Sequence, residues 1–269
     1  MADAANPNAT NPGAANDDLP AAVKPGSSDV PVVVITGASR GIGYALGKAF
    51  GAKKAHVVAI ARTVGGLEQL DDEITVAGGT TTLVPLDLKD HDAIDRLGLA
   101  LFERFGRVDV LISNAGILNG ITPINHVKPK DFDTSLSVNV TANYRLIRSM
   151  DLLLRRSDAG RAIFLTCAPA TRAKPFWGEY AMSKAALESM VRTYAAEMTN
   201  TSVRVNLFDP GPVRTALRAR AVPGEDATKL PLPDDVIAPV MDLASPDFQE
   251  TGVLFDGTSG TIKRFQDAV

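Results

Sequence analysis

Apolar residues follow two patterns along this chain: short continuous runs rich in β-branched residues, and longer stretches with apolar positions three or four apart. The run from Val32 to Ile35, bounded by Pro31 and Gly37, predicts a strand buried on both faces. Further strands are predicted at His56–Ala61, Thr81–Leu86, Val108–Ser113, Arg161–Thr166, Val203–Leu207 and Val253–Phe255. Helical spacing predicts helices from Tyr44 and at Gly66–Ala77, Asp90–Phe105, Lys130–Arg156, Gly178–Thr199 and Asp234–Ala244. Strands alternating with helices predict right-handed crossovers and a parallel sheet.

The first 31 residues differ from the rest of the chain. They are rich in Ala, Asn, Pro, Gly and Asp and hold hardly a large apolar residue. Such a segment buries too little surface to offset its ordering entropy, so residues 1–31 are predicted to be a disordered tail. Residues 32–269 are predicted to form one α/β domain, a common length for this fold class.

Composition excludes several classes of function. The net charge is −3 with the basic residues dispersed, which predicts no nucleic-acid partner. One cysteine and three scattered histidines predict neither a disulfide nor a metal site. No apolar run approaches 18 residues, and the N-terminus lacks a basic and apolar leader. A cytoplasmic protein without a membrane partner is expected.

A glycine-rich segment follows the first strand directly. Thr36-Gly37-Ala38-Ser39-Arg40-Gly41-Ile42-Gly43 opens into a helix, which is the strand–turn–helix context of a dinucleotide-binding fingerprint. Gly37 permits a tight turn, Gly41 lets the backbone approach a pyrophosphate, and Gly43 allows close packing of helix on strand. The helix N-terminus then presents unpaired N–H groups to the phosphates.

The spacing of these glycines, TGxxxGIG, resembles the short-chain dehydrogenases/reductases. Further motifs occur in that family's order and at its usual intervals: Asn114-Ala115-Gly116, Asn139, Tyr180-x3-Lys184 and Pro210-Gly211-x3-Thr215. The resemblance covers about residues 30–260. It implies a three-layer, Rossmann-like α/β fold with helices on both faces of a doubly wound, parallel, seven-stranded sheet, in the strand order 3-2-1-4-5-6-7.

The end of the second strand bears on the choice of cofactor. An NAD enzyme places an acid there to bind the ribose 2′-hydroxyl, whereas this chain has Arg62 and Thr63. Arg62, with Arg40 from the glycine turn, can bind a 2′-phosphate, so NADP(H) is predicted in preference to NAD(H). Two solvated surface arginines are the alternative.

The resemblance implies further cofactor contacts. Asp87 is expected at the adenine, Asn114 and Gly116 beside the adenosine, and Val213 and Thr215 at the nicotinamide carboxamide. The complete set of predicted cofactor-binding residues is Gly37, Ser39, Arg40, Gly41, Ile42, Gly43, Arg62, Thr63, Asp87, Leu88, Asn114, Ala115, Gly116, Tyr180, Lys184, Pro210, Gly211, Val213 and Thr215.

Tyr180 and Lys184 lie four residues apart on a predicted helix and therefore project from one face. Free tyrosine has a pKa near 10, and a neighbouring ammonium together with the charge of the oxidised nicotinamide is expected to lower it. The resemblance makes Tyr180 the acid–base and makes Lys184 both its pKa-lowering partner and the anchor of the nicotinamide ribose. Asn139 matches the residue that holds a water leading from Lys184 to solvent.

Position 167 departs from the family pattern. The family places a catalytic serine there, as donor to the substrate oxygen, and this chain has Cys167. A thiol is a weak donor, so Cys167 is predicted to be a weakened substrate-oxygen donor. The alternatives are a small buried residue in a protein without activity, and a nucleophile, which no neighbouring histidine supports. Strand alternation predicts that Thr166 points away from the site.

Residues 212–234 correspond to the segment that covers the substrate in the family. Arg214, Arg218 and Arg220 fall within it, and either contact an acidic group of the substrate or are solvated. Phe176 and Trp177, just before Tyr180, either line the pocket or pack.

The sequence predicts an NADP(H)-dependent oxidoreductase that transfers a hydride between nicotinamide and a small carbonyl or alcohol substrate. Asn139, Cys167, Tyr180 and Lys184 are its predicted catalytic residues. The alternative is a dinucleotide-binding sensor or scaffold without turnover. The spacing of Tyr and Lys argues against an enoyl reductase, and the glycine turn argues against an epimerase.

The family resemblance implies a homodimer or homotetramer built on the helices at 130–156 and 178–199. The apolar positions of these helices include Leu136, Val140, Leu187, Met190 and Tyr194.

Overall fold

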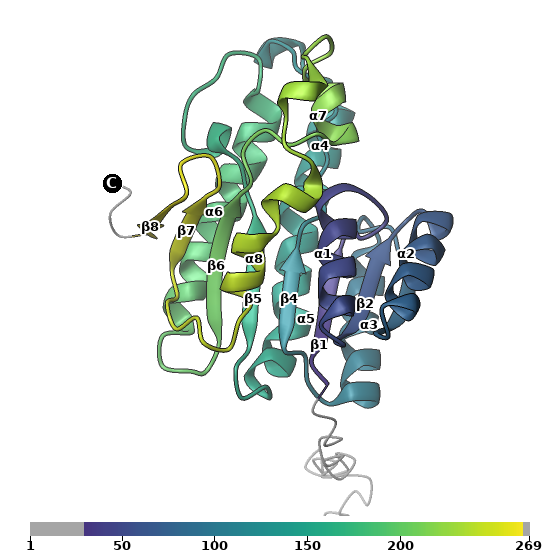
Figure 1. Ribbon diagram of the computed structural model, residues 1–269. Coiled ribbons are helices and arrows are strands. Elements are labelled where there is room, and N and C mark those ends of the chain that lie inside the picture. Colours follow the sequence, from purple (N-terminus) through teal and green to yellow (C-terminus); the bar gives the residue numbers. More distant parts are fainter. Residues whose placement is uncertain (1–29, 266–269) are drawn as a thin grey trace, which may run out of the picture.

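The computed structural model describes residues 30–265, which form a sheet between two layers of helices (Figure 1). The predicted disordered tail therefore lies outside the described residues, except for Val30 and Pro31. The strands are β1 (Val32–Thr36), β2 (His56–Ala61), β3 (Thr80–Pro85), β4 (Val110–Ser113), β5 (Arg161–Leu165), β6 (Arg204–Asp209), β7 (Val253–Asp256) and β8 (Thr261–Arg264). Their order in the sheet is β3-β2-β1-β4-β5-β6-β7-β8.

The predicted α/β architecture and strand order are confirmed, with one addition. Strands β1 to β7 pair in parallel, and β8 pairs antiparallel with β7 through Val253 opposite Arg264. The sheet is thus eight-stranded rather than seven-stranded. The sequence of β8 gave no signal because all four of its residues are exposed and no apolar alternation marks the strand.

Helices cover both faces of the sheet. They are α1 (Gly41–Ala52), α2 (Val64–Val76), α3 (His91–Phe105), α4 (Pro129–Leu136), α5 (Ala142–Arg155), α6 (Gly178–Glu197), α7 (Ala216–Ala221) and α8 (Ala238–Leu243). Short 3₁₀ turns lie at Ile124–His126, Ala168–Ala170, Ala227–Lys229 and Pro233–Val236. Helices α1, α2 and α8 pack on one face, and α3, α5 and α6 pack on the other.

The first strand shows why the chain folds this way. Its side chains alternate between the two cores: Val32 and Val34 pack beneath α3, α5 and α6, whereas Val33 and Ile35 pack beneath α1, α2 and α8. All four are nearly inaccessible to solvent. Burying a Val or Ile side chain contributes roughly 1.5–3 kcal/mol, so a continuous apolar run is stable only between two helical layers.

The long helix predicted over 130–156 is interrupted. Helix α4 ends at Leu136, a π-helical turn spans Ser137–Thr141, and α5 begins at Ala142. Such turns insert one extra residue into a helix and are frequent at functional sites. Asn139 lies at the centre of this turn.

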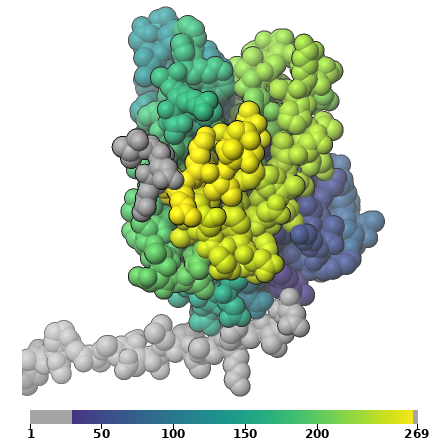
Figure 2. All heavy atoms as spheres, turned by 60° about the vertical axis from the view of Figure 1, so that its left-hand side comes forward, coloured from purple at the N-terminus to yellow at the C-terminus, as the bar shows by residue number. Residues whose placement is uncertain are grey.

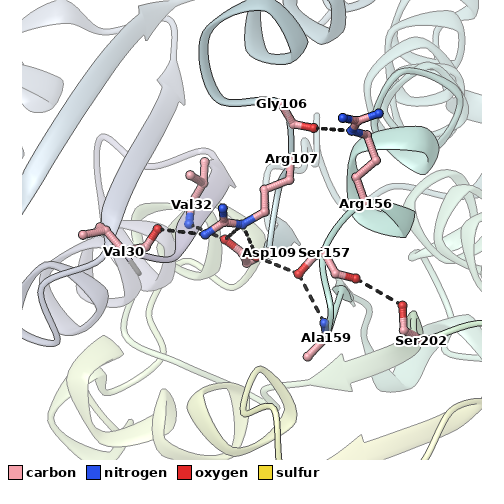
Figure 3. A network of polar contacts seen from close by, with 9 residues as sticks. All are labelled: Val30, Val32, Gly106, Arg107, Asp109, Arg156, Ser157, Ala159 and Ser202. Carbon is pink, nitrogen blue, oxygen red and sulfur yellow. Dashed lines mark hydrogen bonds and ion pairs between the residues drawn. The ribbon is translucent and has the colours of Figure 1, made fainter. Parts of the chain in front are cut away.

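A polar network closes the opposite edge of the sheet, where the strands begin (Figure 3). The Asp109 carboxylate accepts hydrogen bonds from the Val32 backbone N–H (2.8 Å), the Ser157 hydroxyl (2.6 Å) and Arg107 Nε (3.0 Å). Arg107 also donates to the Val30 carbonyl at 3.4 Å. These contacts fix the start of β1 against β4 and leave the carboxyl edge of the sheet for the site.

Candidate active site

The glycine turn after β1 has the backbone geometry that the sequence predicts. Gly37 and Gly41 have φ values of +69° and +61°, which residues with a side chain rarely adopt. A Cβ on Gly43 would lie 2.5 Å from the Gly37 carbonyl oxygen and 2.5 Å from Asn114 Nδ2. The first two glycines are therefore required by conformation and the third by close packing.

Helix α1 begins at Gly41 with its first N–H groups uncapped by a side chain. The N-cap residue, Arg40, is extended and makes no side-chain capping bond. The positive end of the helix dipole therefore faces outward from the carboxyl edge of the sheet, where an anionic group binds favourably. This arrangement fits the pyrophosphate of a dinucleotide.

Two adjoining cavities, of about 340 and 380 Å³, lie along the carboxyl ends of the strands. They share Arg40, Ala115 and Gly116 on one side and Leu217 of α7 on the other. The first extends to Tyr180 and Lys184, and the second to Arg62 and Asp87. Together they form one elongated trough that would hold an extended molecule with an adenosine end and a nicotinamide end.

Most of the predicted cofactor-binding residues line this trough. The exceptions are Ser39, Gly43, Thr63, Gly211 and Val213. Val213 is only 3% exposed. Ser39 instead packs against Gly66 of α2, where an added Cβ would lie 2.6 Å from the Ser39 carbonyl oxygen.

Asn114 has the bracing role expected of it. Its side-chain amide donates to the Thr36 carbonyl at 2.9 Å, and its backbone N–H donates to the Thr36 hydroxyl at 3.1 Å. The end of β4 is thereby fixed to the end of β1. Gly116 follows, and a Cβ there would lie 3.5 Å from Lys184 Nζ, so a glycine keeps the trough open beside the lysine.

Tyr180 and Lys184 lie one turn apart on α6 and both are buried, at 9% and 3% exposed. Lys184 Nζ donates a hydrogen bond of 2.8 Å to the Leu165 carbonyl and lies 5.9 Å from the centre of the Tyr180 ring. Both side chains line the 340 Å³ cavity. The structure therefore brings together the two residues that the sequence singled out.

The pKa of Tyr180 is raised in the protein without cofactor. Burial raises the pKa of its phenol well above 10, and the neighbouring Cys167 and Asp209 raise it further. Burial also lowers the pKa of Lys184. The Lys184 ammonium donates to the Leu165 carbonyl, and removal from water dominates the pKa of Tyr180 in the protein alone. The predicted lowering, which combines Lys184 with the charge of the oxidised nicotinamide, stays a prediction.

Cys167 lies beside Tyr180, where the resemblance places a substrate-oxygen donor. Cys167 packs against the apolar cluster that contains Tyr180, and it is near enough to raise the pKa of the phenol. Burial raises the pKa of Cys167 to about 12 despite the nearby Lys184. A neutral thiol at neutral pH is a poor nucleophile but retains its S–H as a weak donor.

Thr166 lines the 340 Å³ cavity, but its hydroxyl is committed to Glu188. The hydroxyl donates to Glu188 Oε1 at 2.5 Å. Glu188 is 3% exposed, and burial raises the pKa of its carboxyl. Thr166 is therefore not a replacement for the missing serine.

Asn139 is fully buried and its side chain is committed to neighbouring groups. Its oxygen accepts from the Ile117 N–H, and its nitrogen donates to the Ile117 carbonyl and to the Ser183 hydroxyl, each at 2.9 Å. It thereby fixes the loop after β4 against α6. Its water-holding role stays a prediction.

A third cavity, of about 400 Å³, lies on the other side of Tyr180. Cys167, Tyr180, Trp177 and Asp209 line its floor, and Arg172, Lys174 and Arg218 contribute positive charge. Asp209 is 7% exposed, and burial raises the pKa of its carboxyl. Of the two aromatic residues noted in the sequence, Trp177 lines this cavity, whereas Phe176 is 56% exposed and does not.

Sequence reasoning missed several residues of the site. Leu165 accepts the bond from Lys184, Asp209 faces the third cavity, and Leu217 and Lys130 line the trough. Asp209 directly precedes Pro210-Gly211, so its position beside the motif was a usable signal. Lys130 gave none, because its neighbours in space come from distant parts of the chain. Arg220 was noted as a possible contact to an acidic group of the substrate, and the structure places it at the 380 Å³ cavity of the trough.

Within residues 30–265, no group of three or more His, Cys, Asp and Glu side chains is arranged to hold a metal ion. In the same range, no helix has both the length and the apolar character needed to cross a membrane.

A parallel sheet with a glycine turn leading into α1, and a trough along its carboxyl edge, defines a dinucleotide-binding protein of the Rossmann type. Residues 31–226 match the short chain dehydrogenase family. The chain belongs to this family, whose members are oxidoreductases that bind a nicotinamide cofactor.

Three similar proteins illustrate the relationship. The uncharacterized oxidoreductase YciK of Escherichia coli K12 is 31% identical over 85% of this chain and 92% of its own length. A short chain dehydrogenase from Pseudomonas syringae superposes with a TM-score of 0.82 at 33% identity, covering 84% of this chain and 94% of that one. A short chain dehydrogenase from Shigella flexneri 2a, solved in complex with NADP, superposes with a TM-score of 0.80 at 30% identity, covering 85% and 97%.

Proposed function

We propose that this chain is an NADP(H)-dependent reductase of small carbonyl compounds, or in the reverse direction a dehydrogenase of the corresponding alcohols. The observation that carries the proposal is the placement of Tyr180 between the nicotinamide end of the trough and the 400 Å³ cavity, both of which it lines. A substrate in that cavity has its reacting carbon near the cofactor and its oxygen near the phenol.

NADP(H) is favoured over NAD(H) by the charges at the adenosine end. Arg40 and Arg62 both line the 380 Å³ cavity. A 2′-phosphate placed between two guanidiniums gains charge-assisted hydrogen bonds. The NADP bound by the Shigella flexneri relative supports the same choice.

The chemistry follows from the side chains around the reacting oxygen. The reduced nicotinamide, when bound, would supply the hydride that adds to the carbonyl carbon. Tyr180 gives its phenolic proton to the oxygen as negative charge develops there, while Cys167 donates a weak hydrogen bond to the same oxygen. With the cofactor bound, the ammonium of Lys184 would hold the ribose hydroxyls and would stabilise the phenolate that forms when Tyr180 gives up its proton. Oxidation of an alcohol is the reverse, with the phenolate accepting the proton.

The buried Tyr180 phenol carries its proton at neutral pH, which is the form that reduction requires.

A dinucleotide-binding protein without turnover is the second candidate, and Cys167 is the observation that favours it. A panel of aldehydes, ketones, keto esters and alcohols, assayed with both cofactors, distinguishes the two. NADPH oxidation with at least one carbonyl compound supports the reductase. Tight NADPH binding without turnover on the whole panel supports the second candidate.

We propose that the chain forms a dimer or tetramer, but through other residues than the sequence indicated. Leu187 and Tyr194, two of the residues predicted to be available for an interface, are 1% and 4% exposed and belong to the chain's own core. Tyr144 and Leu152 on α5 are instead exposed, at 51% and 59%. We propose that this face of α5 is the contact between copies of the chain.

A further inference from the structure

Helix α7, within the covering segment, presents one side to the trough and another to the third cavity. Leu217 lines both cofactor cavities, and Arg220, one turn later, lines the 380 Å³ cavity. Arg218 instead lines the 400 Å³ cavity and is held by Glu225 through hydrogen bonds of 2.6 and 2.5 Å. The two arginines of this helix therefore lie in different environments.

The 380 Å³ cavity has an excess of positive charge. Its lining includes five basic side chains but only two acidic ones, Asp87 and Asp131. Lys89 forms an ion pair with Asp87 at 3.5 Å. Within residues 30–265, the side chains of the other four have neither a hydrogen bond nor an ion pair; they are Arg40, Arg62, Lys130 and Arg220.

All four residues are exposed, so solvent screens their mutual repulsion, but together they give the cavity a positive potential that favours an anionic ligand. The ligand of this trough is a dinucleotide, and NADP(H) carries a 2′-phosphate as well as a pyrophosphate. Arg40 and Arg62 come from the turns after β1 and β2. The other two come from elsewhere: Lys130 from α4 and Arg220 from α7.

Helices α4 and α7, which carry Lys130 and Arg220, lie at the same end of the molecule (Figure 1). Figure 2 shows the yellow-green segment that includes α7 and the teal segments before it as two lobes at the top of the molecule, separated by a furrow. Figure 1 places α7 and α4 together at this end, beyond the carboxyl ends of the strands. Long basic side chains from both helices thus reach the same cavity.

On the basis of the proposed function, we propose that Arg220 is a cofactor-binding residue supplied by the covering segment, and that its guanidinium, together with Lys130, holds phosphate groups of the dinucleotide. The phosphate contacted is either the 2′-phosphate or the pyrophosphate. Because Leu217 and Arg218 belong to the same helix, cofactor binding also fixes the wall of the 400 Å³ cavity.

The test is a comparison of dinucleotide affinities by isothermal titration calorimetry, which requires no substrate. Arg220→Gln and Lys130→Gln are compared with Lys229→Gln, a matched control. Lys229 lies in the same covering segment, its side chain is 81% exposed, it lines none of the cavities described here, and its neutralisation changes the net charge equally. Arg220→Lys keeps the positive charge. If it recovers affinity for the dinucleotide, the loss in Arg220→Gln is due to the missing charge and not to misfolding.

We expect Arg220→Gln to weaken NADPH binding by about tenfold, in keeping with the loss of one charge-assisted hydrogen bond. Lys130→Gln should weaken it less, Arg220→Lys should restore part of the affinity, and the control should stay within about twofold of wild type. A loss confined to NADPH assigns Arg220 to the 2′-phosphate, and an equal loss for NADH assigns it to the pyrophosphate.

The inference would be overturned if Arg220→Gln bound both NADPH and NADH as tightly as Lys229→Gln does. That result would leave the proposed function intact. A wild-type protein that binds neither dinucleotide would overturn both.

Discussion

The Lys184 ammonium lies 5.9 Å from the centre of the Tyr180 ring, yet its hydrogen bond goes to the Leu165 carbonyl. The lysine is therefore within electrostatic range of the tyrosine without bonding to its hydroxyl. Burial, Cys167 and Asp209 decide the protonation of Tyr180, and all three favour the phenol over the phenolate. The tyrosine therefore carries its proton at neutral pH.

This electrostatic arrangement predicts the pH dependence of reduction. Reduction requires protonated Tyr180, so kcat should fall as the pH rises through the raised pKa of its phenol. The negative charge of Asp209 raises that pKa, and Asp209→Asn should therefore lower it and move the alkaline fall in kcat to lower pH. Asp158→Asn, at an exposed position on the opposite edge, serves as the control. An alkaline fall that stays in place or moves to higher pH in Asp209→Asn would refute this account.

Cys167→Ser should increase turnover. The hydroxyl has nearly the volume of the thiol and is the stronger donor to a developing oxyanion. If most of a donor contribution of about 2.7 kcal/mol returns, kcat rises by up to about a hundredfold, while NADPH affinity changes little. Steady-state kinetics on a substrate from the carbonyl panel measures this. Lower activity in Cys167→Ser would mean that the thiol has a task of its own.

Arg62→Asp should reduce or reverse the preference for NADPH over NADH. The substitution places a carboxylate where the 2′-phosphate is expected, and a carboxylate accepts instead from a ribose 2′-hydroxyl. Fluorescence titration of both cofactors gives the ratio of affinities. Wild-type protein that binds NADH as tightly as NADPH would contradict the specificity proposed here.

The chain should be a dimer or tetramer in solution. Light scattering at micromolar concentration should give a multiple of the 28.4 kDa chain mass. Because Leu152 is 59% exposed on α5, Leu152→Glu should weaken the association without disturbing the core. A wild-type protein of about 28.4 kDa would rule out the interface.

The core of the fold was predictable because its signals are local. The run from Val32 to Ile35 can be stable only between two layers, and β2 has the bounds that its apolar run predicted. Asp90 caps α3 by accepting from the Ala93 N–H at 2.9 Å, where the sequence pattern began that helix. The common placement of Tyr180 and Lys184 was predictable because a spacing of four on a helix fixes a common face.

Other features depend on tertiary structure and left no local signal. The π-helical turn at Asn139 lies inside an uninterrupted helical pattern, and only its contacts with Ile117 and Ser183 distinguish it. The direction of the Tyr180 pKa shift depends on how deeply α6 is buried. Arg220 reaches the trough because α7 lies across it, a placement that the order of residues along the chain does not reveal.

The most direct test of the central claim, that Tyr180 is the acid–base, is Tyr180→Phe assayed in parallel for turnover and NADPH binding. Only the phenolic hydroxyl is removed, so the account predicts that carbonyl reduction is abolished while the dissociation constant for NADPH stays near that of wild type. Retention of most of the activity on a verified substrate would contradict it.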